Sequence, residues 1–284
     1  MELHLAARRA LLPTEGEQAS NVARELLAAA AGKTVEALVA NLRYYAPEDV
    51  ETKLQDYLRR YLAGEPLAYI LGQWEFHGMT LAVTPDVLIP RDDTEAVTEL
   101  AIHRMKLLCS PNPRVLDLCA GSGCIGLAIA REVPDARVTC GELSAAALRV
   151  LRQNVAAQGL SGRVMPLQLD AKKPASAFLG QFDLIVSNPP YVTRAELLTL
   201  PESVKDYEPA VALDGGEDGL DFYRAITENY GPALKPGGWL CYEFGLGQDR
   251  AVCRILRDAG FEIEEVKTDL AGVLRAVAAR KPVE

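Results

Sequence analysis

The chain has 284 residues, of which 49% are hydrophobic and 24% charged, a balance that supports a packed core and argues against disorder. Its 30 basic and 39 acidic residues give a formal net charge of −9, which disfavours nucleic acid as a partner. Apolar runs stay below the roughly eighteen residues of a membrane span, and no secretory apolar segment follows the first charges. We therefore expect a cytoplasmic protein that does not enter membranes. The chain is longer than a single hydrophobic core usually organises, which predicts one full-sized domain and a smaller one.

The positions of the cysteines and histidines argue against disulfides, metal sites and hydrolase chemistry. No C-x-x-C pair occurs, and several cysteines lie in apolar, strand-like runs, so we interpret all six as reduced thiols. The three histidines, His4, His77 and His103, are too scattered for a metal site or a Ser-His-Asp triad. No metal is expected.

Residues 1–72 are predicted to form a small all-helical domain. Its clearest helix begins at Pro47 and runs toward Gly64, with an apolar face of Val50, Leu54, Tyr57, Leu58 and Tyr61. Two shorter helices are expected over residues 20–32 and 33–42, each opened by a capping Ser, Asn or Thr. The domain carries 8 basic and 10 acidic residues, so it is no basic nucleic-acid module. A structural cap and a partner-docking module both fit this pattern.

Residues 73–90 are predicted to form a β-hairpin linker. The apolar period changes to two at Trp74 and Phe76, breaks at His77-Gly78, and resumes at Leu81 and Val83.

Residues 91–284 alternate between apolar strands and helices. Strands are expected at 114–119, 137–142, 164–170, 182–188, 237–244, 261–266 and 274–279, and helices at 124–132, 144–158, 219–234 and 247–259. This alternation predicts an α/β, doubly wound, mostly parallel seven-stranded Rossmann-like sheet. The last two strands have no room for a helix between them, so we expect them to pair antiparallel.

The first of these strands leads into a glycine-rich loop, DLCAGSGCIG. Gly121, Gly123 and Gly126 satisfy G-x-G-x-x-G, which predicts a nucleotide-like ligand at a helix N-terminus. Glu142 ends the second strand 19 residues after Gly123, where a carboxylate can accept both ribose hydroxyls. Asp170 closes the third strand, as an acceptor for an adenine amino group or as an ordinary capping Asp. A tight turn followed by a surface Glu is the alternative for the loop and Glu142.

Two cofactor classes fit this loop, nicotinamide dinucleotides and adenosylmethionine. Asp117, four residues before the first glycine, resembles the class I methyltransferase loop. No Arg or Lys lies within the loop to offset a pyrophosphate, which also disfavours a dinucleotide.

The fourth strand runs into Asn188-Pro189-Pro190-Tyr191. Because the first and fourth strands of a doubly wound sheet are neighbours, we expect this segment to face the glycine loop. The Asn188 side-chain oxygen and the Pro189 carbonyl are placed to accept hydrogen bonds from a substrate NH2 group, and Tyr191 to stack on it. This arrangement predicts direct methyl transfer driven by positioning. A Pro-Pro turn with a core tyrosine is the alternative.

Together, six segments resemble the HemK-type release factor glutamine methyltransferases over nearly the whole chain. They are FHGMTLAVTPDVLIPRDDTE, DLCAGSGCIG, FDLIVSNPPYV, YEPAVALDGGEDGLDFYR, LKPGGWLCYEFGLGQ and DLAGVLRAV. The resemblance implies transfer of a methyl group from S-adenosyl-L-methionine, leaving S-adenosyl-L-homocysteine, to the glutamine amide of the GGQ tripeptide in class I peptide chain release factors. It also implies that the helical domain engages the release factor, and we expect a monomer.

Carried over by motif, the resemblance assigns the site residues. Asn188, Pro189, Pro190 and Tyr191 would be catalytic. The cofactor would be bound by Asp117, Cys119, Ala120, Gly121, Ser122, Gly123, Glu142, Asp170, Ala171 and Asn188.

The sequence departs from the family pattern at four positions. Cys119 stands where the family often has Gly, Glu142 where Asp is common, Asp92 where Pro is usual, and Ala171 where larger side chains are frequent. These changes put fine geometry in doubt more than activity.

Two further segments each have two interpretations. Arg91, Thr94 and Glu95 lie near the active-site entrance by resemblance, or at a helix start capped by Asp92, Asp93 or Thr94, which we prefer. Residues 214–221 are a glycine-rich loop near the substrate or a solvated acidic turn.

Three other functions compete with glutamine methylation. An adenine N6-methyltransferase acting on DNA or RNA shares NPPY but would need a basic surface around the cleft. A non-catalytic adenosylmethionine-binding protein and, last, a dehydrogenase are the others.

Overall fold

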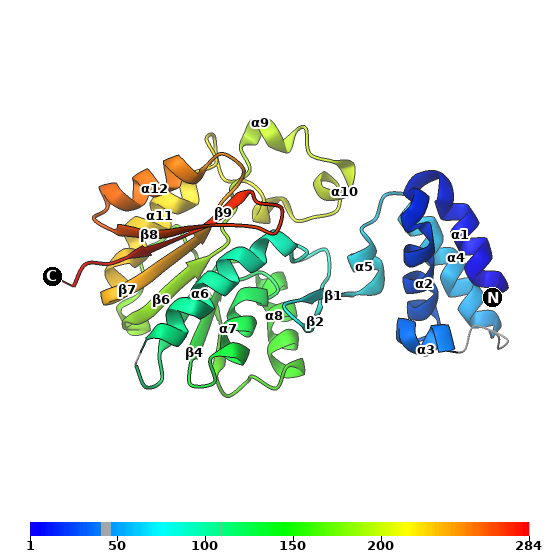
Figure 1. Cartoon of the computed structure of the whole chain (residues 1–284), viewed down its shortest axis with the longest axis horizontal. Coiled ribbons are helices and arrows are strands. Elements are labelled where there is room, and N and C mark those ends of the chain that lie inside the picture. The colour runs from blue at the N-terminus through cyan, green and yellow to red at the C-terminus, as the bar shows by residue number, and fades with distance from the viewer. Residues whose placement is uncertain (41–46, 109, 284) are drawn as a thin grey trace. The chain divides into compact units, whose positions relative to one another are not determined.

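The computed structural model describes residues 1–40, 47–108 and 110–283 (Figure 1). These residues form two compact units. The first comprises Met1–Gln73 and Glu202–Tyr207, and the second comprises Trp74–Pro201 and Glu208–Glu284.

The first unit is helical. Leu11, Leu26 and Leu54 are buried at its centre, so an apolar stripe from each of three helices forms one core. Its helices are α1 (Glu2–Glu15), α2 (Ala19–Ala30), α3 (Val35–Ala40), α4 (Glu48–Leu62) and α5 (Leu67–Leu71).

Helix starts in this unit confirm one predicted cap and correct another. The Thr34 hydroxyl accepts a hydrogen bond from the Ala37 amide at 3.2 Å, as a cap of α3 should. The predicted Ser or Asn cap of α2 is wrong, because Ser20 and Asn21 lie inside the helix. A 3₁₀ turn at Gly16–Gln18 runs directly into α2, so no extended capping residue precedes it. The last two residues of the predicted helix 33–42 lie outside the described residues.

A short segment from the second half of the chain also belongs to the first unit. Helix α10 (Glu202–Lys205) leads to Tyr207, whose hydroxyl donates a hydrogen bond to the Ala63 carbonyl at 2.9 Å. No sequence pattern indicated this association.

The second unit begins with a hairpin and continues into one large sheet. Strands β1 (Gln73–Phe76) and β2 (Met79–Ala82) pair around His77-Gly78, as predicted. The sheet has seven strands, β3 (Arg114–Leu118), β4 (Arg137–Glu142), β5 (Val164–Gln168), β6 (Phe182–Ser187), β7 (Leu234–Glu243), β8 (Glu262–Thr268) and β9 (Leu274–Arg280).

The strand order is β5-β4-β3-β6-β7-β9-β8, and only β9 runs antiparallel to its neighbours. The predicted fold class is therefore confirmed, including the neighbouring first and fourth strands and the final antiparallel pair. Leu118 of β3 is in register with Ser187 of β6, so the loops that follow them start side by side.

Helices cover both faces of the sheet (Figure 1). One apolar cluster joins the sheet to α6 (Glu95–Leu107), α7 (Cys124–Glu132) and α8 (Ala145–Ala157). The other joins it to α11 (Asp221–Tyr230) and α12 (Asp249–Asp258). The remaining short helix is α9 (Arg194–Leu197).

The helix expected over residues 219–234 is α11 followed by a separate 3₁₀ turn, Gly231–Ala233, because Pro232 cannot continue the α-helical ladder. Cys119, Cys124, Cys140, Cys241 and Cys253 are free thiols, and Cys109 lies outside the described residues.

Candidate active site

The glycine loop joins β3 to α7 with three residues at positive φ. These are Cys119 at 58°, Gly121 at 53° and Gly123 at 86°. Only glycine fits at position 123, because a Cβ there would lie 2.1 Å from Leu151 Cδ1. At Gly121 a Cβ would meet nothing within 4 Å, so open space remains above the loop backbone. The loop is therefore shaped to let a ligand approach its main chain.

Glu142, the last residue of β4, forms a hydrogen bond with this loop. Its Oε2 accepts a hydrogen bond from the Gly121 amide at 2.8 Å, and its Oε1 accepts one from the Ser144 amide at 2.8 Å. Each oxygen keeps a further lone pair, so the carboxylate can still accept from a ligand. The structure thus brings the two motifs together.

Asp117 lies within β3, completely buried beneath the loop. Its Oδ2 accepts a hydrogen bond from the Gly126 amide at 2.9 Å, near the start of α7. Burial raises its pKa to about 7, although the Gly126 hydrogen bond opposes this change. Asp117 therefore supports the loop from below, and direct contact with a cofactor remains a prediction.

Asp170 and Ala171 follow β5. The Asp170 Oδ1 accepts a hydrogen bond from the Lys172 amide at 2.9 Å, which is the capping turn that was one of its two interpretations. Its Oδ2 lies 3.6 Å from the Lys173 ammonium group, which is largely exposed. Ala171 is buried. Recognition of adenine by Asp170 stays a prediction.

Asn154 on α8 was not anticipated, and it connects the glycine loop to the hairpin. Its Nδ2 donates to the carbonyls of Ser122 at 2.9 Å and Ala82 at 3.0 Å, while its Oδ1 accepts from the Ala82 amide at 2.7 Å. The side chain is 1% exposed. The signal was a polar residue on the apolar face of a helix, between Leu151 and Val155.

We predict that Asn154→Ala lowers the free energy of unfolding by about 3 kcal/mol, because buried partners lose their hydrogen bonds. Gln158→Ala, which removes one exposed bond to the Thr80 carbonyl, should change it by less than about 1 kcal/mol. Urea denaturation of both variants measures the difference. Equal small losses would show that Asn154 does not hold the hairpin to the loop.

The Asn188-Pro189-Pro190-Tyr191 segment follows β6, beside the glycine loop. The Ser187 hydroxyl donates to the Leu118 carbonyl at 2.7 Å, so the two strand ends are joined directly. Pro189 and Pro190 are buried and Asn188 is half-buried. The predicted meeting of the glycine loop and this segment therefore occurs in the structure, whereas the roles of the individual residues remain predictions.

Tyr191 is held on both sides by groups that the motif did not reveal. Its carbonyl accepts from Gln248 Nε2 at 3.0 Å, and its hydroxyl donates to Glu243 Oε1 at 3.4 Å. Burial and the Glu243 carboxylate raise the pKa of Tyr191, so its hydroxyl stays protonated.

The loop at residues 214–221 packs against the backbone of Tyr191. A Cβ on Gly215 would lie 2.7 Å from Tyr191 Cα, and one on Gly219 would lie 2.4 Å from the Tyr191 carbonyl oxygen. The exposed Glu217 and Asp218 lie in the same loop. The interpretation as an acidic, solvated turn is therefore confirmed, and the same turn packs against the NPPY segment, whereas its nearness to a substrate stays a prediction.

Thr94 stands at the N-cap position of α6, but its hydroxyl contacts the site instead of a helix amide. Asn188 Nδ2 donates to the Thr94 hydroxyl at 3.1 Å, and neither the 3₁₀ turn Asp92–Thr94 nor α6 has a side-chain cap. The preferred interpretation is therefore right about the helix start and wrong about a capping side chain. Arg91 pairs with the buried Glu208, and Glu95 accepts from the His77 amide at 3.3 Å.

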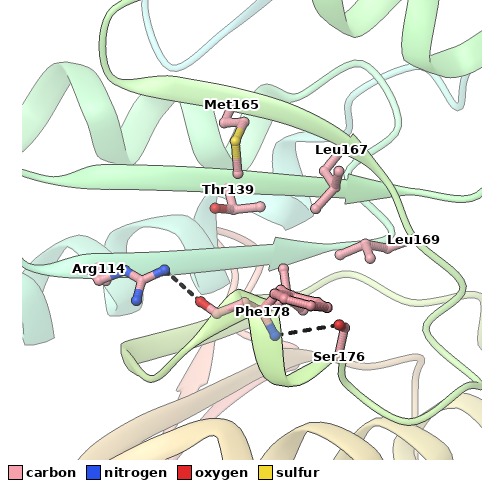
Figure 2. A pocket seen from close by; sticks show the side chains of 8 residues that line it. Arg114, Thr139, Met165, Leu167, Leu169, Ser176 and Phe178 are labelled. Atoms are coloured by element: carbon pink, nitrogen blue, oxygen red, sulfur yellow. Dashed lines mark hydrogen bonds between the residues drawn. The ribbon is translucent and has the colours of Figure 1, made fainter.

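A separate hollow of about 350 Å³ lies on the β4–β5 side of the sheet (Figure 2). Figure 2 shows Met165 and Leu167 on one side of it and Phe178 on the other. It contains none of the predicted site residues, and its lining is mainly apolar.

Two findings concern the described ranges as a whole. Within residues 1–40, 47–108 and 110–283, no group of His, Cys, Asp or Glu side chains could hold a metal ion. None of the helices described in these ranges is long and apolar enough to cross a membrane.

Two family models match separate parts of the chain. One, described as "Methyltransferase small domain", matches residues 90–201, and the other, "PrmC N-terminal domain", matches residues 2–72. Among solved structures, the hMettl16 catalytic domain in complex with MAT2A 3'UTR hairpin 6 has a TM-score of 0.57 at 16% identity, covering 73% of this chain and 77% of that chain. That likeness shows the fold alone. The match to the methyltransferase family model, on a chain with this fold, defines a methyltransferase.

Two curated relatives specify the family. A release factor glutamine methyltransferase of Bradyrhizobium diazoefficiens is 39% identical, with 98% of this chain and 92% of the relative covered. A protein of the same name from Geobacter sulfurreducens is 44% identical, with 76% and 73% covered. The chain belongs to the release factor glutamine methyltransferase family, which confirms the predicted resemblance and enzyme class.

Proposed function

We propose that this protein methylates the side-chain amide of the GGQ glutamine in class I release factors, with S-adenosyl-L-methionine as donor. The observation that carries the proposal is the junction of the glycine loop and the NPPY segment, joined through Ser187 and Leu118 at 2.7 Å. Family membership supports the choice of acceptor. The cofactor, when bound, supplies an electrophilic methyl group on a sulfonium.

The residues present fit such a donor. The open space over Gly121 admits a ligand to the loop backbone, and the Glu142 carboxylate beside it provides acceptors for ribose hydroxyls. Cys119, Ala120, Ser122 and Gly123 would line the methionine end, and Asp170 and Ala171 the adenine side.

On the acceptor side, Asn188 and Pro189 hold the glutamine nitrogen. The Asn188 Oδ1 and the Pro189 carbonyl each accept one hydrogen of the substrate NH2 group, which orients the nitrogen for in-line attack. Two consecutive prolines fix the backbone, so the carbonyl direction is set before the substrate binds. Tyr191 covers the planar amide. Orientation of this kind contributes on the order of 7 to 11 kcal/mol to a bimolecular step.

The proposal also covers the helical N-terminal domain, and it includes a cytoplasmic location and a monomeric state. We assign release-factor docking to residues 1–72, because a family model of its own matches residues 2–72 in a chain whose relatives are named release factor glutamine methyltransferases. Residues 73–90 would link this domain to the catalytic domain, residues 91–284.

A labelling experiment tests the acceptor. The protein is incubated with methyl-labelled S-adenosylmethionine and a release factor, the same factor with Gln→Ala at GGQ, or total nucleic acid. Label on the intact factor only is the expected result. Label on nucleic acid would favour an adenine methyltransferase instead, and no label on any acceptor would favour a non-catalytic binding protein.

A binding prediction tests the cofactor side. Glu142→Ala should raise the Kd for S-adenosylmethionine about 10- to 100-fold, because hydrogen bonds to a charged group contribute roughly 1.5 to 3 kcal/mol. Isothermal titration calorimetry measures it. Glu132→Ala, on the exposed end of α7, is the control and should leave the Kd unchanged. An unchanged Kd for Glu142→Ala would remove this residue from the cofactor site.

A further inference from the structure

Residues 243–248, with the sequence EFGLGQ, run from the last residue of β7 to the residue before α12. Three of them contact Tyr191, the last residue of the NPPY segment. The Glu243 carboxylate accepts a hydrogen bond from the Tyr191 hydroxyl at 3.4 Å, and Gln248 Nε2 donates to the Tyr191 carbonyl at 3.0 Å. A Cβ added to Gly245 would lie 3.0 Å from the ring carbon Cδ2 of Tyr191. The segment therefore contacts Tyr191 at its hydroxyl, its ring and its backbone.

The side-chain amide of Gln248 is held in one orientation. Its Oε1 accepts from the Gly245 amide at 2.9 Å, and its Nε2 donates to the carbonyls of Tyr191 at 3.0 Å and Gly219 at 3.5 Å. A reversed amide would place its oxygen against two carbonyls and its NH2 group against an N–H group, so all three hydrogen bonds would be lost. The Gln248 main-chain amide also donates to the Gly245 carbonyl at 3.1 Å, which closes the turn. These contacts fix the donor that holds the Tyr191 carbonyl.

Helix capping does not account for the Gln248 side chain. A polar residue at the N-cap usually accepts a hydrogen bond from an amide of the first helical turn. Gln248 occupies the N-cap position of α12, but its side chain makes no such bond. Its side-chain hydrogen bonds serve the NPPY segment and the loops beside it instead.

A ring that covers the substrate amide must be held in place before the substrate binds. The two prolines fix φ at positions 189 and 190, but they leave the side-chain torsions of Tyr191 free. We propose that Gln248 is a positioning residue, which holds the Tyr191 carbonyl so that the ring packs on Gly245 over the glutamine amide. This inference rests on the proposed function, because it deepens the role of Tyr191 in covering that amide.

Two substitutions of Gln248 test its role in steady-state methylation of a release factor. Gln248→Ala should lower kcat about tenfold, with KM for the release factor unchanged, because the lost hydrogen bond acts only through orientation. Gln248→Glu at pH 8 keeps the acceptor for the Gly245 amide but cannot donate to the Tyr191 carbonyl, so it should lose as much. Gln158→Ala, which removes a side-chain amide that donates to the Thr80 carbonyl, should keep the wild-type kcat. An unchanged Kd for S-adenosylmethionine in every variant shows that the fold is intact.

Gly245→Ala tests the contact with the ring. Its added Cβ would lie 3.0 Å from both Tyr191 Cδ2 and Gln248 Oε1, so one of these groups must shift by a few tenths of an ångström. We expect kcat to fall about threefold or more, since methyl transfer depends on exact placement. Gly231→Ala is the matched control, because its Cβ would lie 3.3 Å from the ring of Phe261, outside the site. It should keep the wild-type kcat.

A double-mutant cycle shows whether Gln248 acts through Tyr191. In a Tyr191→Ala background, Gln248→Ala should change kcat less than about twofold, because no ring remains to be positioned. A merely structural role would give the same fold loss in both backgrounds. Single-turnover transfer of labelled methyl groups measures the slow variants.

Different outcomes overturn different claims. Wild-type kcat in Gln248→Ala, Gln248→Glu or Gly245→Ala, or an equal loss for Gln248→Ala in both backgrounds, would overturn the positioning role while leaving the proposed function in place. A wild-type protein that transfers no label to the release factor would overturn the proposed function, and the positioning role with it.

Discussion

Asn188→Ala is expected to lower kcat about 10²- to 10³-fold, which corresponds to roughly 3 to 4 kcal/mol, the effect of deleting one preorganised hydrogen-bonding group. The methyl-accepting nitrogen loses the side-chain acceptor that orients it, while the docking surfaces of the release factor are untouched. KM for the release factor should therefore change little. Single-turnover transfer from labelled S-adenosylmethionine measures the chemical step directly.

Gln158→Ala is the control for this variant, because it removes a side-chain amide just after α8 and outside the site. It should retain full turnover. If Asn188→Ala also retained full turnover, Asn188 would have no part in the mechanism, and the proposed geometry of the NPPY segment would fail.

Gly219→Ala is expected to abolish most activity and to destabilise the second unit. An added Cβ would lie 2.4 Å from the Tyr191 carbonyl oxygen and 2.6 Å from Gln248 Nε2, so the backbone of the NPPY segment must move. Positive φ at Gly219, 72°, adds about 1 to 2 kcal/mol, and the overlap adds roughly 1 to 3 kcal/mol. Urea denaturation and kcat report the two effects.

Gly260→Ala is the control that distinguishes the effect of backbone strain from the effect of a steric overlap. Gly260 has a φ of 85°, but its added Cβ would meet nothing within 4 Å. It should lose only the strain energy, about 1 to 2 kcal/mol, and keep its kcat. Equal kcat values for the two variants would show that the loop at residues 214–221 does not support the active site.

The sheet was predictable because its signals are local. Runs such as FDLIVS are largely apolar, with apolar residues on both faces, which is typical of buried parallel strands, and glycines and prolines separate them from the helices. The neighbouring first and fourth strands then followed from general topology, and placed the glycine loop beside Asn188.

The details of the site depend on contacts between distant segments, which local patterns do not encode. Asn188 and Thr94 come from separate segments, as do Tyr191 and Glu243, and only the folded chain brings each pair together. Thr94 also had a local role as the residue that begins a helix, and its position there is right, but its hydroxyl bonds to Asn188 and not to a helix amide. Polar residues within apolar runs, such as Asn154 and Glu243, were the usable signal for both missed contacts.

Asp117 shows the converse case. Its position in the motif was recognised, and the contact that the structure shows is an inward one, from the Gly126 amide to its carboxylate. This contact supports the loop, and a role in binding the cofactor stays a prediction.

A crystal structure with S-adenosyl-L-homocysteine and a GGQ peptide would test the active-site assignment most directly. We predict that the sulfur lies over the loop at Gly121, and that the glutamine nitrogen donates to both the Asn188 side-chain oxygen and the Pro189 carbonyl. A peptide glutamine bound elsewhere, or an Asn188 that turns its NH2 group toward it, would contradict this assignment.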